Sequence, residues 1–376
     1  MTSERWALEE VCEKKSSNLM QKDLNLGTGE FPIYGASGLL GYVDFYQRDK
    51  EYIGIVKDGA GVGRAMLLPA KSSCIGTMEY LVPKDCISSH YLYYAVESMN
   101  LAKYNTGATI PHIYFRDYKK ETLPKKGRDE QEYIASNLDK VVETIRKRRA
   151  QLQFFDDLVK SQFIEMFGEI GSDKNGWGIH PLVEYCDVNP KKGEDTRIRK
   201  GMEVSFVPMQ SVSEQGDIDA TAVRTYEEVQ NGFTYFSEGD VLFAKITPCM
   251  ENGKGAIARG LKNSVGFGST EFHVLRPKAG VCNSEWIYAI TSFPQFRQDA
   301  AKKMTGSAGQ RRVPASFLAS YLVSCPPFEL QERFARFVEQ TDKSKVLLAI
   351  KLFFHLYTAI CLKAFEKSSQ MMYNHR

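Results

Sequence analysis

The chain has 376 residues, of which 43% are hydrophobic and 25% are charged, and its formal net charge is +3. This composition is typical of a soluble globular protein with room for two domains of ordinary size. The slight basic excess permits an anionic partner without requiring one.

Eight cysteines are scattered along the chain, and no two have Cys-x-x-Cys spacing. The pattern indicates neither a zinc site nor a disulfide framework, so we expect reduced thiols and no metal. The first ten residues are too charged for a secretory signal, and no apolar run is long enough to span a membrane. These features predict a cytoplasmic protein.

Residues 1–128 are expected to form a globular unit of helices and strands. Short β-rich runs at 52–56, 65–68 and 80–82 are separated by glycine-rich turns. A short helix is predicted over residues 90–99, and a loop over residues 105–111 follows it.

Residues 129–168 predict one long helix, because the stretch has no Pro and its only Gly is the last residue. Asp129 and Glu132 have the spacing of a capping box, and Gly168 suits a helix end. At 1.5 Å per residue the helix would be roughly 58 Å long. Its apolar residues repeat with heptad spacing and define a narrow seam that needs a partner. The seam consists of Ile134, Leu138, Val141, Ile145, Leu152, Phe155, Val159 and Met166. Ordinary core packing is the alternative interpretation of such a seam.

The second half of the chain repeats the order of the first. After a polar link, residues 177–327 contain segments that resemble the first unit, and residues 329–366 predict a second long helix. Both helices open with Gln-Glu, at positions 131 and 331, so an offset of 200 relates them. Residues 367–376 are interpreted as a polar tail. The matches are sparse, which indicates a duplicated framework whose contents have diverged.

This order predicts an α+β architecture. Two globular units would sit at opposite ends of two long helices that pack antiparallel as a coiled coil, related by a pseudo-twofold axis. Such a body suits a linear polymer with two separated sites, and duplex DNA is the obvious candidate.

The sequence resembles the specificity (S) subunit of a type I restriction-modification enzyme. The resemblance depends on residues 131–139 and 158–168, which open and close the first helix, and on Gly239-Asp-Val-Leu-Phe-Ala-Lys245 and Thr106-Gly-Ala-Thr109. It covers essentially the whole chain, because these motifs occur in the same order in both halves.

The resemblance implies two target-recognition domains, over residues 1–128 and 177–327, on two helical spacers. Each domain would read one half of a bipartite double-stranded DNA site. It also implies that two methyltransferase (M) subunits dock on the helices and that restriction-translocase (R) subunits join the complex. We assign the docking to the first helix, at Ile134, Leu138, Leu158, Phe163 and Phe167. The second helix departs from the family pattern at the seam positions of Thr341, Lys345 and His355.

Candidate DNA contacts lie on polar, glycine-rich loops in matching places of the two units. Lys, Arg, Asn and Gln are the usual readers of base edges, and glycines let backbone N–H groups approach a phosphate. The candidates are Lys57, Arg64, Thr106, Thr109 and His112 in the first unit and Lys245, Thr247, Lys254, Gln310, Arg311 and Arg312 in the second. Gln310-Arg311-Arg312 is the most concentrated set of donors, so we expect it to read bases; solvated loop charges are the alternative.

A basic run, Arg146-Lys-Arg-Arg149, lies in the middle of the first helix. We expect Arg146 and Arg149 to meet phosphates between the half-sites, which would make binding depend steeply on salt. An acidic protein partner is the alternative.

No catalytic motif was found. The chain lacks a P-loop, and the Gly-x-Gly-x-Gly of residues 59–63 lacks the following helix of a dinucleotide site. Glu271 and His273 fall on one side of a predicted strand, and we interpret them as a structural polar contact. We match Glu79 with Glu271 and Leu81 with His273.

We therefore expect a non-enzymatic DNA-recognition subunit without a cofactor. A self-contained endonuclease acting at a bipartite site is the rival hypothesis, and a coiled-coil adaptor that binds only proteins is a third.

Overall fold

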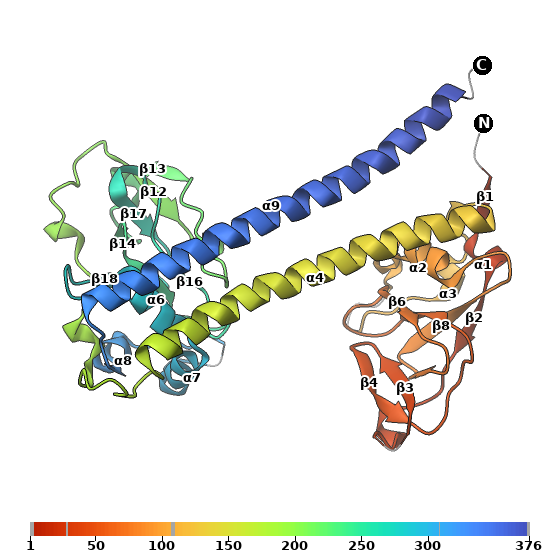
Figure 1. Cartoon of the computed structure of the whole chain (residues 1–376), viewed down its shortest axis with the longest axis horizontal. Helices are drawn as coiled ribbons and strands as arrows, with labels where there is room; N and C mark the ends of the chain where they lie inside the picture. Colours follow the sequence, from red (N-terminus) through yellow and green to blue (C-terminus); the bar gives the residue numbers. More distant parts are fainter. Residues whose placement is uncertain (1–3, 28, 107–109, 308, 374–376) are drawn as a thin grey trace. The chain divides into compact units, whose positions relative to one another are not determined.

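The structure is a computed structural model that describes residues 4–27, 29–106, 110–307 and 309–373, without the side chains of residues 194 and 352–373. The chain divides into two compact units, Met1–Arg146 and Lys147–Arg376. Both mix helices with sheets, so the predicted α+β class is confirmed (Figure 1). None of the helices in this described part has the length and apolar character needed to cross a bilayer.

Unit 1 is built on a four-stranded antiparallel sheet in the order β2-β8-β5-β6. A smaller sheet has the order β4-β3-β7, and β1 pairs with β9. The strands are β1 (Arg5–Ala7), β2 (Cys12–Ser16), β3 (Phe31–Gly35), β4 (Gly38–Val43), β5 (Tyr52–Val56), β6 (Ala65–Leu68), β7 (Ser73–Cys74), β8 (Met78–Pro83) and β9 (Thr122–Pro124). The helices are α1 (Leu8–Val11), α2 (Ser89–Ser98), α3 (Phe115–Tyr118) and the start of α4 (Arg128–Phe167). The predicted runs at 52–56 and 65–68 coincide with β5 and β6.

Unit 2 repeats this plan, with one additional strand, β14, in its outer sheet. Its central sheet has the order β11-β18-β15-β16, its outer sheet has the order β13-β12-β17-β14, and β10 pairs with β19. The strands are β10 (His180–Pro181), β11 (Cys186–Val188), β12 (Glu203–Val207), β13 (Val223–Thr225), β14 (Thr234–Ser237), β15 (Val241–Ala244), β16 (Gly255–Ile257), β17 (Val265–Gly268), β18 (Phe272–Pro277) and β19 (Leu322–Val323). The helices are α5 (Tyr226–Val229), α6 (Ser284–Ser292), α7 (Pro294–Lys303), α8 (Ala315–Ser320) and α9 (Phe328–Tyr373). In both units the inner strand of the outer sheet, β3 or β12, has one parallel neighbour, β7 or β17.

The registers of the two central sheets fix which residues are equivalent. Cys12 lies opposite Pro83 in unit 1, and Cys186 lies opposite Pro277 in unit 2. Both cysteines are buried, and each thiol donates to the carbonyl four residues before it. The duplication inferred from sparse matches is therefore a duplication of sheet order and register.

Each long helix is tied to its unit by a fully buried glutamine near its start. In α4, the side-chain oxygen of Gln131 accepts from the Ser88 N–H at 2.8 Å, and its amide donates to the Cys86 and Lys126 carbonyls. In α9, Gln331 accepts from the Asn283 N–H at 3.0 Å and donates in the same way to residues 281 and 326. The residues that donate to the glutamines, at 88 and 283, are themselves the N-caps of α2 and α6. The duplicated Gln thus joins the long helix to the short helix of its unit.

Within unit 2, the end of α4 packs against the start of α9. Phe163 and Phe167 lie 5.6 and 5.4 Å from Phe334, ring centre to ring centre, and Asp156 pairs with Lys345 at 2.8 Å. A later residue of α4 meets an earlier residue of α9, so these segments run antiparallel. Burial alone would lower the pKa of Lys345, but its ion pairs with Asp156 and Asp342 raise it.

The second long helix continues to Tyr373, past residue 366, where the sequence analysis ended it. Residues 367–373 contain neither Pro nor Gly, so nothing in them stops a helix. The start of the polar tail was therefore placed too early. The predicted seam residue His355 lies outside the described side chains, whereas Thr341 is buried and donates to the Phe337 carbonyl at 2.9 Å.

Candidate nucleic-acid interface

The central sheet of each unit ends in an edge that carries three basic residues at equivalent positions. The first is Lys57, directly after β5, and its counterpart Lys245, directly after β15. The Lys57 carbonyl accepts from the Ile113 N–H at 3.1 Å, and the Lys245 carbonyl accepts from the Val313 N–H at 2.9 Å. These bonds bring the loop that precedes α3 or α8 to the end of the sheet.

The second matched position is Arg64 in unit 1 and Lys254 in unit 2, each directly before the outermost strand. Arg64 donates to the Ala36 carbonyl, just after β3, and Lys254 donates to the Met209 carbonyl, just after β12, at 3.3 Å. Both cations therefore link the central sheet to the outer sheet of their unit. Arg64 is exposed and Lys254 is half-buried.

The third matched position is His112 in unit 1 and Arg312 in unit 2. The backbone of His112 forms a β-bridge with that of Asp58, and its imidazole ring hydrogen-bonds to the Asp58 carboxylate. Arg312 bridges to residue 246, and its guanidinium holds the Glu271 carboxylate with two nitrogens, at 2.9 and 2.8 Å. The bond from Arg312 lowers the pKa of Glu271, so this pair is ionised at neutral pH.

The register corrects the match made from the sequence for Glu271 and His273. The Lys57 N–H donates to the Thr77 carbonyl and the Lys245 N–H donates to the Glu271 carbonyl, so Thr77 and Glu271 are equivalent. It follows that Glu79 matches His273, two residues later. The turns before β8 and β18 both have three residues, 75–77 and 269–271, so the sequence match was two residues out of register.

Glu79 and His273 are buried polar groups at the same place in the two sheets. Burial raises the pKa of Glu79, whose carboxylate accepts from the Tyr118 hydroxyl. Burial lowers the pKa of His273, whose Nε2–H donates to the Val313 carbonyl at 2.8 Å and whose Nδ1 accepts from Asn189 at 3.1 Å. Both contacts are satisfied inside the fold, which supports the structural interpretation of this pair.

Part of the chain is similar to a known protein family. Residues 2–153 match the family model of the type I restriction modification DNA specificity domain. The type I restriction enzyme EcoAI and EcoEI specificity subunits of Escherichia coli are 38% and 42% identical over 162 and 159 residues, which is 42% of this chain in each case.

Over residues 2–153 the chain is thus similar to type I restriction modification DNA specificity domains. The matched segments span only 27% and 26% of those two relatives. The crystal structure of a type I restriction-modification S subunit from M. genitalium has a TM-score of 0.55 and covers 96% of this chain and 94% of its own. At 15% identity, this likeness extends the fold, and the fold alone, to the rest of the chain.

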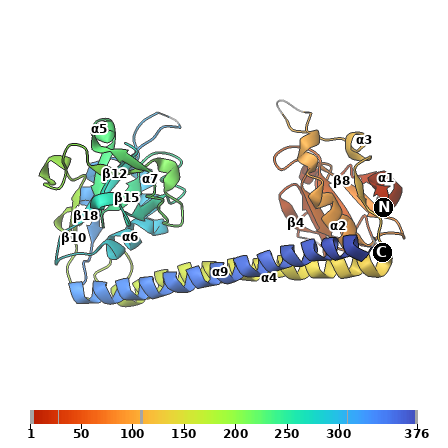
Figure 2. The ribbon, with the colours of Figure 1, turned by 90° about the horizontal axis from the view of Figure 1, so that it is seen from above.

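Three basic residues within the matched segment lie on the edge defined above, namely Lys57, Arg64 and His112, and unit 2 repeats the edge. Figure 2 shows α5 on the side of unit 2 away from α9. Thr106 is exposed and donates to the His112 carbonyl at 3.3 Å, whereas Thr109 lies outside the described residues.

The loop over residues 305–312 presents its donors unequally. Arg311 donates to the Ala301 carbonyl at 2.6 Å, and Arg312 is held by Glu271. Gln310 is exposed, and its side-chain amide has no hydrogen-bond partner among the residues that the structure describes. Thr247 donates to the Glu251 carboxylate at 2.8 Å. Of the three residues expected to read bases, Gln310 is the one ready to do so without giving up a contact.

Two of the assigned docking residues are part of the core of unit 2. Phe163 and Phe167 are 3% exposed and pack against Phe334 and Trp177. Their assignment as docking residues is therefore corrected, because a side chain this buried offers nothing to another subunit. Their i, i+4 spacing fits a docking stripe and a core stripe equally well.

The other assigned residues of α4 are half-buried or exposed. Ile134 packs against the core of unit 1, and Leu138 and Leu158 are half-buried. In the basic run, Arg146 forms a two-bonded ion pair with Glu143, and Arg149 is exposed. Arg149 is thus the freer of the two proposed phosphate contacts.

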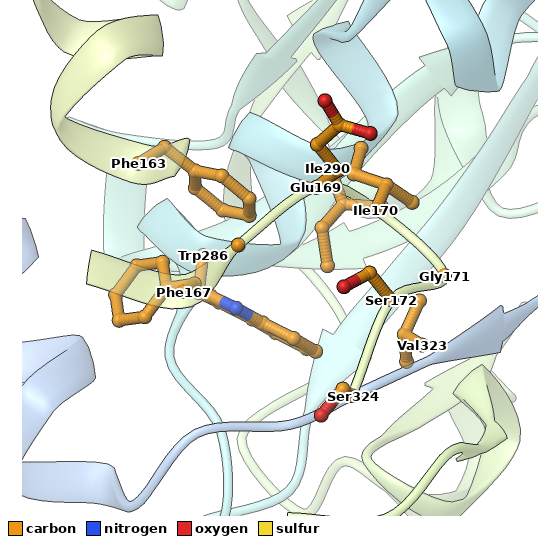
Figure 3. Close-up of a pocket in the computed structure, with 11 residues that line it drawn as sticks. Phe163, Phe167, Glu169, Ile170, Gly171, Ser172, Trp286, Ile290, Val323 and Ser324 are labelled. Carbon is orange, nitrogen blue, oxygen red and sulfur yellow. The ribbon is translucent and has the colours of Figure 1, made fainter. Parts of the chain in front are cut away.

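A small cavity lies where α4 ends, beside α6 and β19 (Figure 3). Its volume is about 10 Å³, and the rings of Phe163, Phe167 and Trp286 line it. Among the described residues, the Trp286 indole nitrogen is the buried side-chain group that has no hydrogen-bond partner. The space suits at most one water molecule, so it is a packing defect rather than a ligand pocket.

Proposed function

We propose that the chain is the DNA-specificity subunit of a type I restriction-modification complex. Unit 1, with its specificity domain, reads one half of a bipartite, asymmetric duplex site, and unit 2 reads the other half. The observation that carries this proposal is the repeated cationic edge, because equivalent backbone positions with different side chains are what two readers of different half-sites need.

In this proposal the domains extend over residues 1–128 and 177–327, and α4 and α9 act as spacers that pack antiparallel along their length. Each domain reads roughly three to five base pairs, with centres about one helical turn apart. Two methyltransferase subunits dock on the helices, with Ile134, Leu138 and Leu158 as contacts on α4, and restriction-translocase subunits join them. The exposed apolar residues of α9 add to this docking surface; they are Val346, Leu347 and Ile350.

The chain itself supplies recognition and no chemistry. Cations and amides on the edge bind phosphate oxygens and base edges, and the helices position the partner subunits over the bound site. Arg312 has a fixed geometry because Glu271 holds it, so it presents its remaining N–H groups in one orientation.

Methylome sequencing of a host that carries the gene with its partner genes tests the proposal. We expect a split, asymmetric methylated motif, and a continuous motif or none would contradict it. Gln310→Ala should relax only the half of the motif read by unit 2, by about 1–3 kcal/mol of discrimination. His112→Ala should affect only the other half, and a change in both halves from either variant would refute the assignment of halves to units.

A further inference from the structure

One strongly basic segment of unit 2 lies outside the matched edge. Residues 189–202, between β11 and β12, contain five cations and two carboxylates. Their excess of three positive charges equals the formal net charge of the whole chain, +3, so the remaining residues balance one another. The corresponding segment of unit 1, residues 17–30, has one cation and two carboxylates.

The segment begins beside the cationic edge. The Asn189 side chain bonds to His273 and accepts from the Val274 N–H at 3.0 Å, and His273 in turn bonds to the carbonyl of Val313, next to Arg312. The segment then crosses towards the outer sheet, where Lys192 donates to the Gln230 carbonyl. It therefore continues the positive charge of the edge across unit 2.

An ionic network fixes the middle of the segment. Asp195 accepts from Arg197 at 2.6 Å and from the Tyr235 hydroxyl at 2.7 Å. Tyr235 lies beside Arg276, whose guanidinium pairs with the 1% exposed Asp240. The bond from Arg197 holds the pKa of Asp195 far below its usual range, so the carboxylate stays ionised. The network therefore anchors the segment to the outer sheet, and we call it the anchor.

Contacts within unit 2 engage two of the five cations of the segment, and the other three remain exposed to solvent. Arg197 is taken by Asp195, and Lys192 by a carbonyl and by the ring of Tyr226, 5.9 Å away. The other three are exposed, and none forms an ion pair with the residues that the structure describes; they are Lys191, Arg199 and Lys200. Three unpaired cations on a backbone held in one conformation form a preorganised site for a polyanion.

We propose that residues 189–202 form a phosphate-binding arm that gives unit 2 a stronger, sequence-independent hold on DNA than unit 1 has. The proposal rests on the proposed function, since it assumes that unit 2 binds duplex DNA. Lysines are point charges without the fixed fork of an arginine, so Lys191 and Lys200 suit phosphate oxygens better than paired base-edge acceptors. The arm therefore adds affinity and salt dependence without altering the sequence read.

The test uses the full chain, with its methyltransferase partner, and measures affinity for a duplex carrying its site over a range of salt concentrations. The variant is K191Q/R199Q/K200Q, whose three positions are exposed, so the substitutions leave the core of unit 2 intact. Each lost phosphate contact should lower the slope of log K against log salt by about 0.9, so we expect a decrease of about 2–3. Affinity at low salt should fall by about 10- to 100-fold, with the methylated motif unchanged.

The matched control removes the same charge from unit 1, in K22Q/K50Q/K71Q, three exposed lysines outside its edge. An unchanged salt slope in the arm variant would refute the proposal that residues 189–202 bind phosphates. An equal decrease of the salt slope in the control would refute it as well. A relaxed motif would show base reading instead of phosphate binding and would also overturn it. Absence of salt-dependent binding by the wild type would instead refute the proposed function.

Asp195→Asn tests the anchor separately. It keeps the three exposed cations and frees Arg197 from its ion pair, so the salt slope should not fall, while affinity should fall several-fold because the arm must be ordered on binding. Wild-type affinity in this variant would show that the network does not preorganise the arm.

Discussion

The loop between the first two cations of the edge is supported differently in the two units. In unit 1, residues 57–64 are held by close backbone contact: a Cβ on Gly63 would lie 2.3 Å from the Ala102 nitrogen. In unit 2, Arg297 is 7% exposed, and its guanidinium donates to carbonyls of the corresponding loop, including those of Met250 and Gly253. The backbone position was kept while its support changed, which explains why the two halves share so few residues.

The largest effect should come from removing the support of unit 2. Arg297→Met leaves the loop carbonyls and the Thr291 carbonyl without their donor, and it removes a cation 4.4 Å from the centre of the Phe243 ring. We expect a loss of about 3–5 kcal/mol in the free energy of unfolding of unit 2. Hydrogen exchange read separately on peptides of the two units should locate the loss in unit 2. Arg336→Met, an exposed position on α9, is the control, and equal losses in both variants would contradict the role given to Arg297.

A pair of glycine substitutions tests the support of unit 1. Gly63 and Gly253 are equivalent and have nearly the same φ, +85° and +86°, but only Gly63 meets a backbone within 3 Å. Gly253→Ala should cost about 1 kcal/mol, because alanine resists a left-handed backbone. Gly63→Ala should cost about 3 kcal/mol, because the clash adds to that strain. Chemical denaturation measures both, and equal costs would show that Ala102 moves aside.

The buried glutamines are a feature in which the two units are alike, because Gln131 and Gln331 make equivalent hydrogen bonds. Gln131→Met and Gln331→Met each leave one N–H and two carbonyls without a partner in a site of similar size. We expect each to cost about 2–3 kcal/mol, and Gln340→Met, an exposed position on α9, to cost almost nothing. A large difference between the first two variants would mean that the glutamines no longer perform the same task.

The features that could be predicted from the sequence were those with local causes. Missing breakers and heptad spacing located α4, and short apolar runs located β5 and β6. The features that could not be predicted depend on contacts between distant segments. The pairing of β8 with β5 and of β18 with β15 sets the match of Glu79 with His273, and the burial of Phe163 depends on Phe334, far along the chain.

In the candidate site, too, the sequence predicted the features with local causes and missed those that depend on distant contacts. Polar, glycine-rich loops identified the cations of the edge, but nothing local shows that Glu271 holds Arg312 or that Asp58 holds His112. The basic segment 189–202 had a visible signal in its charge. That signal became informative only once the ionic network showed which cations remain exposed.

The smallest effect, and the one that separates the units most sharply, is their response to pH. Burial raises the pKa of Glu79 above its ordinary value of 4.5, so the folded unit 1 binds a proton more tightly than the unfolded chain. Its contribution to stability is full below pH 4.5 and is lost as pH rises through the raised pKa. Burial lowers the pKa of His273 below 6.5, so its contribution to unit 2 is full above pH 6.5 and is lost as pH falls through the lowered pKa.

The two units should therefore respond to pH in opposite directions at one equivalent position. Each group contributes a slope of at most about 1.4 kcal/mol per pH unit. Glu79→Gln should remove the component from unit 1 and His273→Gln the component from unit 2, in denaturation profiles recorded between pH 4 and 8 with hydrogen exchange read on each unit. Glutamine can still accept from Tyr118 in one case and donate to the Val313 carbonyl in the other, so the comparison isolates the proton. If either substitution leaves the profile of its unit unchanged, that buried group titrates alike in the folded and unfolded chain, and the cause assigned to its shifted pKa is wrong.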